Sequence, residues 1–181
     1  MVTRERGRGM SQKDTGTWYE NAGGLVQSNE WYTPPEIFIA LKTDFDLDVA
    51  SPKEKIPWIP AEYWFHEGND GLKKDWFGFV WCNPPYGKDT GKWLQKFVEY
   101  GNGIALVFSR TETQWFHDYA VQADILCFIK RRLAFYKPHA VDQYVQAKQG
   151  STGSLLIGCG EQAIKAIKQA KLGYVVENWK M

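Results

Sequence analysis

The chain has 181 residues, of which 44% are hydrophobic and 15% aromatic, so it is long and apolar enough to bury the core of one globular domain. Its net charge of +1 excludes an overall basic surface, and any affinity for nucleic acid must come from local patches. Three scattered cysteines without Cys-x-x-Cys spacing argue against a metal site and a disulfide framework. Since no signal peptide or membrane-length apolar run is visible, we expect a cytoplasmic protein without a membrane partner.

The first 28 residues differ in composition from the rest of the chain. They are polar and contain Arg4, Arg6 and Arg8 among several glycines. This composition predicts a mobile arm over residues 1–28, followed by a single domain over residues 29–181. The arginines suit either a solvated leader or a tail that seeks phosphate.

A helix start is predicted at Thr33-Pro34-Pro35-Glu36, which has the spacing of a capping box with proline at the first helical position. The helix should continue to about Lys42. Exposed N–H groups at such a start can hold an anion, with Trp31 just before it. An ordinary capped helix, with Trp31 as a hydrophobic anchor, explains the same pattern.

The stretch Phe45–Ala50 alternates apolar residues with aspartates and predicts a strand, which Ser51-Pro52 then breaks. A carboxylate at the carboxyl end of a central strand lies beside the ligand crevice of an open α/β sheet. Asp48 is therefore a candidate binding residue, with a polar strand face as the alternative. The usual glycine-rich cofactor loop of the D/E-x-G-x-G type is missing here.

Residues 52–76 lack clear periodicity and predict mostly loop with a short helical turn. Within them, Asn69-Asp70-Gly71 is a turn signal. Asp70 suits either an Asx turn or a contact to a ligand.

A buried strand is predicted over Phe77–Cys82, and it runs directly into Asn83-Pro84-Pro85-Tyr86. Because two prolines cannot continue a ladder and restrict their neighbours, the strand must end in a stiff loop. This loop presents one amide and one aromatic ring. It suits methylation of a planar amine, whose lone pair is freed when acceptors engage its N–H groups.

Asn83 Oδ1 is one such acceptor, and the Pro84 carbonyl is the second. Pro85 stiffens the loop, and Tyr86 offers a face on which a flipped-out base can stack. Asn83 is not a base, so the proton would leave after methyl transfer.

Strands and helices alternate in the remaining chain. Thr90 can cap a helix that ends near Gly101, a strand follows over Ile104–Phe108, and Thr111-Glu112-Thr113-Gln114 has the spacing of a second capping box. Arg110, between that strand and that box, suits either a substrate contact or a structural ion pair.

The carboxyl-terminal third contains the chain's main basic cluster. A strand is predicted over Ile125–Ile129, and Lys130-Arg131-Arg132 follows at once, with aromatic residues after it. Basic and aromatic residues interleaved at a strand end suit a flipped base and its phosphates, although an exposed basic loop is the alternative. We then expect a mobile loop over residues 141–153, a strand over Leu155–Cys159, a helix over Glu161–Lys171 and an edge strand over Tyr174–Val176. The alternation predicts an α/β fold.

Several of these motifs resemble known enzymes. Asn83-Pro84-Pro85-Tyr86 matches the (D/N/S)PP(Y/F) motif of amino-methyltransferases that use S-adenosylmethionine. Further segments resemble the phage-type DNA N6-adenine methyltransferases and occur in that family's order over roughly residues 30 to 160. They are Trp31-Tyr32-Thr33-Pro34, the run from Phe45 to Ser51, Asp70-Gly71-Leu72 with Trp76, Arg110-Thr111-Glu112-Thr113 with Trp115-Phe116-His117, and Arg132-Leu133-Ala134-Phe135.

This resemblance implies a three-layer, Rossmann-like methyltransferase fold around a mostly parallel sheet. It also implies methyl transfer from S-adenosylmethionine to N6 of a flipped-out adenine in DNA, without a metal or a stable protein partner. For a phage protein, the compartment would be the cytoplasm of the bacterial host. The cofactor contacts would come from Trp31, Thr33, Asp48, Ala50, Ser51 and Asp70, and the DNA contacts from Arg110, Lys130, Arg131 and Arg132.

Two alternatives remain open at this point. The same loop could serve the planar amine of RNA adenine or of a protein glutamine. The missing glycine-rich loop also leaves room for a catalytically degenerate module that binds nucleic acid.

Overall fold

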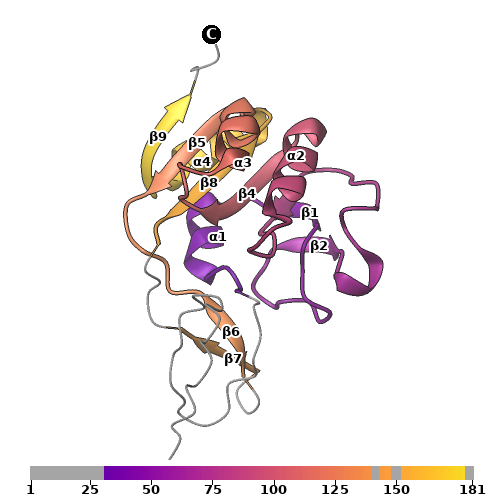
Figure 1. Ribbon diagram of the computed structural model, residues 1–181. Coiled ribbons are helices and arrows are strands. Elements are labelled where there is room, and N and C mark those ends of the chain that lie inside the picture. The colour runs from indigo at the N-terminus through magenta and orange to yellow at the C-terminus, as the bar shows by residue number, and fades with distance from the viewer. Residues whose placement is uncertain (1–30, 140–142, 148–151, 178–181) are drawn as a thin grey trace, which may run out of the picture.

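The computed structural model describes residues 31–139, 143–147 and 152–177, so the arm predicted over residues 1–28 lies outside the described residues. A seven-stranded sheet with the order β2-β1-β3-β4-β8-β5-β9 forms the centre of the molecule (Figure 1). Its strands are β1 (Phe45–Asp48), β2 (Ala61–Trp64), β3 (Val80–Cys82), β4 (Gly103–Phe108), β5 (Ile125–Ile129), β8 (Ser154–Cys159) and β9 (Gly173–Glu177).

Five strands of the sheet run in one direction. The strands β1 to β4 pair in parallel, and β8 is antiparallel to both β4 and β5, so β5 runs the same way as β4. Only β8 and the edge strand β9 are reversed. The carboxyl ends of β1 to β5 therefore meet at one edge of the sheet, where open α/β sheets bind ligands.

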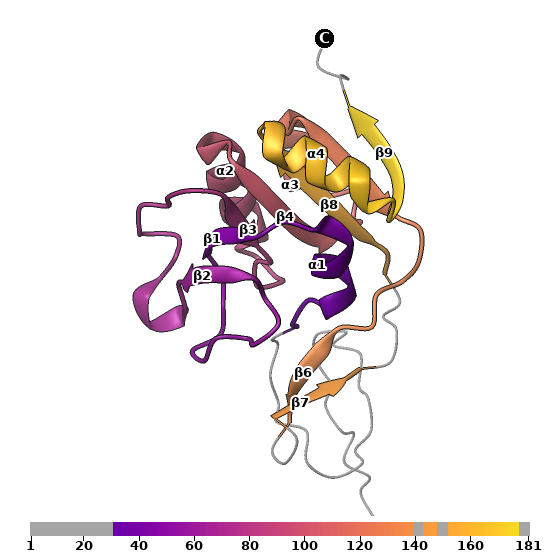
Figure 2. The ribbon, with the colours of Figure 1, turned by 180° about the vertical axis from the view of Figure 1, so that it is seen from behind.

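Helices cover both faces of the sheet. The described helices are α1 (Pro35–Leu41), α2 (Thr90–Tyr100), α3 (Gln114–Asp118) and α4 (Glu161–Ala170), with 3-10 turns at η1 (Glu67–Asn69) and η2 (Ala120–Gln122). α2 and α3 cover one face (Figure 1), while α1 and α4 cover the other (Figure 2). The predicted three-layer α/β fold with a mostly parallel sheet is confirmed.

Each layer has its own hydrophobic core because side chains alternate along the strands. In β3, Trp81 packs toward α1, whereas Val80 and Cys82 pack toward α2. Helix spacing completes the burial, since Trp93 and Phe97 of α2 lie one turn apart on its inner face.

The predicted helix caps are wrong in detail. α1 begins after Pro34 and not after Thr33, and no side chain caps it. Thr113 does precede α3, but its hydroxyl donates to the Arg110 carbonyl at 2.7 Å and leaves the helix amides uncapped. Thr90 is the first residue of α2 and no cap, because its hydroxyl binds the preceding loop. In each case, the hydroxyl found a competing partner or a different place.

Two strands were missed and one was predicted too long. β2 lies within residues 52–76, which were expected to be mostly loop, and β7 (Gln143–Gln146) lies within the loop predicted over 141–153. β3 begins only at Val80 because Gly78 has a φ of 64°, a left-handed conformation that ends strand geometry. Tyr174–Val176 falls within β9, as predicted.

The strand β7 forms a separate hairpin with β6 (Tyr136–His139), away from the main sheet (Figures 1 and 2). Tyr32 and Tyr136 join this hairpin to the segment before α1 through two backbone hydrogen bonds of 2.8 and 2.9 Å. None of the described helices has the length and hydrophobicity of a membrane-spanning segment.

Candidate active site

A cavity of about 580 Å³ opens at the carboxyl ends of β1 and β3. This volume is within the range of pockets that bind small molecules and cofactors. Three segments far apart in the chain form most of its wall: the end of β1 with the residues after it, the turn around Asp70, and the loop that follows β3. The predicted site residues that line it are Trp31, Asp48, Ala50, Ser51, Asp70, Asn83, Pro84, Pro85 and Tyr86.

Asp48 is a buried carboxyl group at the end of β1, with 3% of its surface exposed. Its Oδ1 accepts a hydrogen bond from the Ala50 amide at 3.1 Å, which also shapes the turn after the strand. Burial raises the pKa of Asp48 to about 7, and this effect outweighs the lowering by the Ala50 amide and by the nearby Ser51 hydroxyl. Asp48 is therefore poised to ionise near neutral pH.

Two polar groups in the cavity wall lack a partner among the described residues. The Ser51 hydroxyl lies near Asp48 but makes no hydrogen bond of regular geometry, and the indole N–H of Trp81 is likewise unpaired. Buried polar groups are usually hydrogen-bonded, so unpaired ones beside a cavity indicate that a polar ligand completes them. Trp81 was expected only as part of a buried strand, and its sequence context contains no signal of this role.

The Asn83 carboxamide is held at both ends. Its Nδ2 donates to the Trp31 carbonyl at 2.6 Å, and its Oδ1 accepts from the Tyr86 hydroxyl at 3.4 Å. An amide oxygen has two lone pairs, so Oδ1 retains one acceptor site. None of the described residues donates to the Pro84 carbonyl, which is the second acceptor expected from the sequence.

Thr90 fastens the motif loop to α2. Its hydroxyl donates to the Pro85 carbonyl at 3.2 Å and accepts from the Gly87 amide at 3.1 Å. The predicted stiffness of the loop therefore comes from this hydroxyl as well as from the two prolines.

Tyr86 has only one free face. Its ring stacks on Phe108 of β4 with a centroid distance of 3.8 Å and an interplanar angle of 16°. The side chain keeps part of its surface exposed, yet burial raises the pKa of the phenol, which therefore remains a proton donor at neutral pH. Phe108 in turn contacts Phe135, and Phe135 contacts Trp31, both edge to face. This aromatic chain links the motif loop to the segment before α1.

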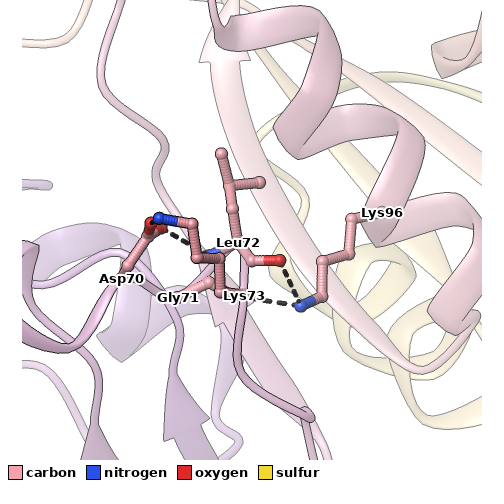
Figure 3. Close-up of polar contacts among 5 residues, drawn as sticks. All are labelled: Asp70, Gly71, Leu72, Lys73 and Lys96. Atoms are coloured by element: carbon pink, nitrogen blue, oxygen red, sulfur yellow. Dashed lines mark hydrogen bonds and ion pairs between the residues drawn. The ribbon is translucent and has the colours of Figure 1, made fainter.

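Asp70 is an Asx-turn residue at the cavity wall (Figure 3). Its Oδ1 accepts from the Leu72 amide at 3.3 Å, and its Oδ2 pairs with Lys73 at 2.8 Å. The hydrogen bond from Lys73 lowers the pKa of Asp70, so the group is ionised at neutral pH. The turn predicted from Asn69-Asp70-Gly71 is confirmed, while a contact from Asp70 to a ligand stays a prediction.

Gly71 explains why a glycine follows this aspartate. A Cβ there would lie 2.1 Å from the Val49 carbonyl oxygen, so the turn packs directly against the end of β1. Lys96 of α2 donates to the carbonyls of Gly71 at 3.1 Å and Leu72 at 2.9 Å (Figure 3), and Trp76 Nε1 donates to the Gly71 carbonyl at 2.7 Å. These contacts hold the cavity wall in place.

Thr33 does not lie in the cavity wall. Its side chain is fully buried and its hydroxyl is unpaired, while its carbonyl accepts from Trp58 Nε1 at 2.8 Å. The predicted anion site at the start of α1 also fails. Pro34 and Pro35 have no N–H groups, and the Ile37 amide already donates to Pro34.

The basic candidates lie outside the cavity but at the same edge of the sheet. Arg110 follows β4, and Lys130, Arg131 and Arg132 follow β5; all four side chains are exposed. None of the ion pairs within the described ranges involves them. His66, expected at the surface, is instead part of the cavity wall, and its sequence context contains no signal of this.

Burial of Asp48 predicts a cost to stability that depends on pH. The pKa rises from 3.8 to about 7 on folding, so the folded state loses stability as the pH rises through this window. Asp48→Asn should abolish this loss. Its advantage in unfolding free energy over the wild type should grow by about 3 kcal/mol between pH 5 and pH 8. Urea denaturation at both pH values measures it, and an equal difference at the two pH values would contradict it.

The fold and the cavity can now be set beside known proteins. The chain matches the family model described as DNA N-6-adenine-methyltransferase (Dam) over residues 25–170. Comparison with curated proteins and with solved structures returned no match. The matched region contains every element from α1 to α4, and with them the motif loop and the cavity wall. On this evidence, the chain belongs to the DNA N-6-adenine-methyltransferase (Dam) family and is an adenine-specific DNA methyltransferase.

Proposed function

We propose that this DNA adenine methyltransferase uses S-adenosylmethionine, bound in the cavity between β1 and β3, to methylate an adenine that has flipped out of the helix. The observation that carries the proposal is that one cavity joins the Asp48 carboxyl group to the Asn83 amide. When bound, S-adenosylmethionine supplies a methyl group activated by its sulfonium.

The residues in the cavity wall fit this cofactor. The unpaired Ser51 hydroxyl and Trp81 N–H can bond to a polar ligand, and the Asp48 carboxylate can accept from hydroxyl or amine groups. Trp31, Ala50 and Asp70 complete the proposed contact set. Asp70 would accept from the adenine amine of the cofactor with a carboxylate that its turn already orients.

The motif loop would polarise the target amine. Asn83 Oδ1 and the Pro84 carbonyl accept one N–H each, which favours tetrahedral geometry at the nitrogen and frees its lone pair. Since neither group is a base, the amine proton leaves after methyl transfer. The target base would stack on the face of Tyr86 that Phe108 leaves free.

The exposed basic residues at the carboxyl edge would hold the DNA backbone. Arg110 and the cluster Lys130-Arg131-Arg132 follow β4 and β5, whose ends share this edge with the cavity. In a chain with a net charge of +1, a local cluster of this kind is the natural source of phosphate contacts.

The alternatives have less support. The family match favours DNA over RNA adenine and over protein glutamine. A degenerate binding module would have no need of two unpaired polar groups beside a cavity that reaches the motif loop.

The cofactor proposal predicts that Asp48→Asn weakens S-adenosylmethionine binding. Loss of a charge-assisted hydrogen bond lowers affinity by about ten- to hundredfold. Isothermal titration at pH 8 measures this, with Asp44→Asn as a control because Asp44 is exposed and lies outside the cavity. Wild-type affinity should also rise as the pH increases through 7, because the carboxylate form is the acceptor. Equal affinity of Asp48→Asn and wild type would remove Asp48 from the cofactor site.

The DNA proposal predicts a change in salt dependence. Replacing Arg131 and Arg132 with glutamine should weaken DNA binding and flatten the plot of log K against log salt by about 0.9 per lost duplex contact. The double variant Lys165→Gln/Lys168→Gln on α4 removes the same charge from another surface and serves as the control. If both double variants change the slope equally, the cluster is only part of a general electrostatic effect.

The catalytic proposal separates Asn83 from Tyr86. Asn83→Ala should lower the single-turnover rate by about 10²–10³ and leave DNA and cofactor binding nearly unchanged, because its contact matters in the transition state. Tyr86→Ala should weaken capture of the flipped base, since stacking is worth about 1–3 kcal/mol per base, and Tyr86→Phe should be mild.

Single-turnover methylation and 2-aminopurine fluorescence at the target position measure the two effects. Full activity of Asn83→Ala would sink the mechanism. Equal damage from Tyr86→Phe and Tyr86→Ala would reject the stacking role and assign the effect to the hydroxyl that donates to Asn83.

A further inference from the structure

The orientation of the Asn83 amide depends on a residue 52 positions earlier in the chain. The 2.6 Å hydrogen bond from Nδ2 to the Trp31 carbonyl requires the nitrogen of the amide to face Trp31. The oxygen must then face the other way, toward Tyr86 and the cavity. The position of the Trp31 main chain therefore decides which end of the amide is available to a substrate.

Trp31 is held in turn by three consecutive residues at the start of the β6–β7 hairpin. Tyr136 forms both hydrogen bonds of the bridge to Tyr32, at 2.8 and 2.9 Å. Phe135 contacts the Trp31 ring edge to face at 6.3 Å. On the other side of Tyr136, the ammonium group of Lys137 lies 3.8 Å from the centre of the same ring.

The contact between Lys137 and Trp31 is closer than the other cation–π contacts described. Lys96 lies 5.0 Å from the Trp76 ring, and Lys55 lies 5.8 Å from the Trp64 ring. Partial burial also lowers the pKa of Lys137, which shows that its ammonium group has lost part of its hydration. Cation–π contacts are stronger when the cation is desolvated, so this contact can fix the Trp31 ring.

We propose that Lys137 is a positioning residue for methyl transfer: from the β6–β7 hairpin it holds Trp31, and Trp31 orients the Asn83 carboxamide toward the target amine. The inference rests on the proposed function of Asn83. It also explains the place of the hairpin in the chain. The basic cluster at residues 130–132 leads directly into Phe135, so the segment proposed to bind DNA continues into the segment that holds the amide.

The test compares Lys137→Met, which keeps the length of the side chain and removes its charge, with Lys137→Arg, which keeps the charge. At saturating DNA and cofactor, Lys137→Met should lower the single-turnover rate about tenfold, with less than about twofold change in either dissociation constant. Lys137→Arg should restore most of the rate. Lys55→Met, which removes the more distant contact to Trp64, should leave the rate unchanged.

A double-mutant cycle tests whether the effect passes through the amide. In an Asn83→Ala background, Lys137→Met should cause no further loss of rate, because no amide remains to be oriented. Independent losses that multiply would overturn the proposal. So would a Lys137→Met variant with a normal rate, or one whose whole defect lies in DNA affinity and its salt slope, which would make Lys137 a phosphate contact.

A readout without activity keeps this inference separate from the proposed function. The side-chain amide signals of Asn83 in a ¹⁵N–¹H NMR spectrum, assigned by their loss in Asn83→Ala, should shift in Lys137→Met and not in Lys55→Met. Unshifted signals in Lys137→Met would overturn the inference. Shifted signals in a protein whose Asn83→Ala variant methylates DNA at the full rate would support the linkage and reject the proposed role of Asn83.

Discussion

The hydrogen bond between Asn83 and the Trp31 carbonyl is the contact on which the arrangement of the site depends. An asparagine side chain is useful as an acceptor only if its oxygen faces the substrate, and the two ends of an amide have similar shapes. Here the main chain of a distant segment selects the end. The motif loop provides the stiffness, through its prolines and Thr90, while the orientation comes from outside the loop.

Asp48 shows the opposite balance between stability and function. Burial at the end of β1 raises its pKa to about 7, so the carboxylate is costly to the folded protein at neutral pH. The unpaired groups of Ser51 and Trp81 lie in the same cavity wall. Buried groups of this kind are tolerated where a ligand satisfies them, so the free protein bears a cost that cofactor binding would remove.

The sequence by itself determined the features that depend on neighbouring residues. Hydrophobic runs and their breaks located most strands of the sheet, since a run of buried residues that ends at Pro84-Pro85 must end as a strand. The same reasoning placed Asp48, the motif loop and the basic cluster at strand ends, and parallel strands bring such ends to one edge. The alternation of strands and helices was sufficient for the fold class.

Tertiary structure alone decided the features that depend on distant partners. The edge strand β2 and the strand β7 have short, weakly patterned sequences, and each becomes a strand only because a partner strand lies beside it. The Thr33 hydroxyl and the predicted caps failed for the same reason, because the position of a hydroxyl relative to a helix end is set by packing. The links from Lys137 to Trp31 and from Trp31 to Asn83 cross large sequence separations, and local patterns contain no information about such contacts.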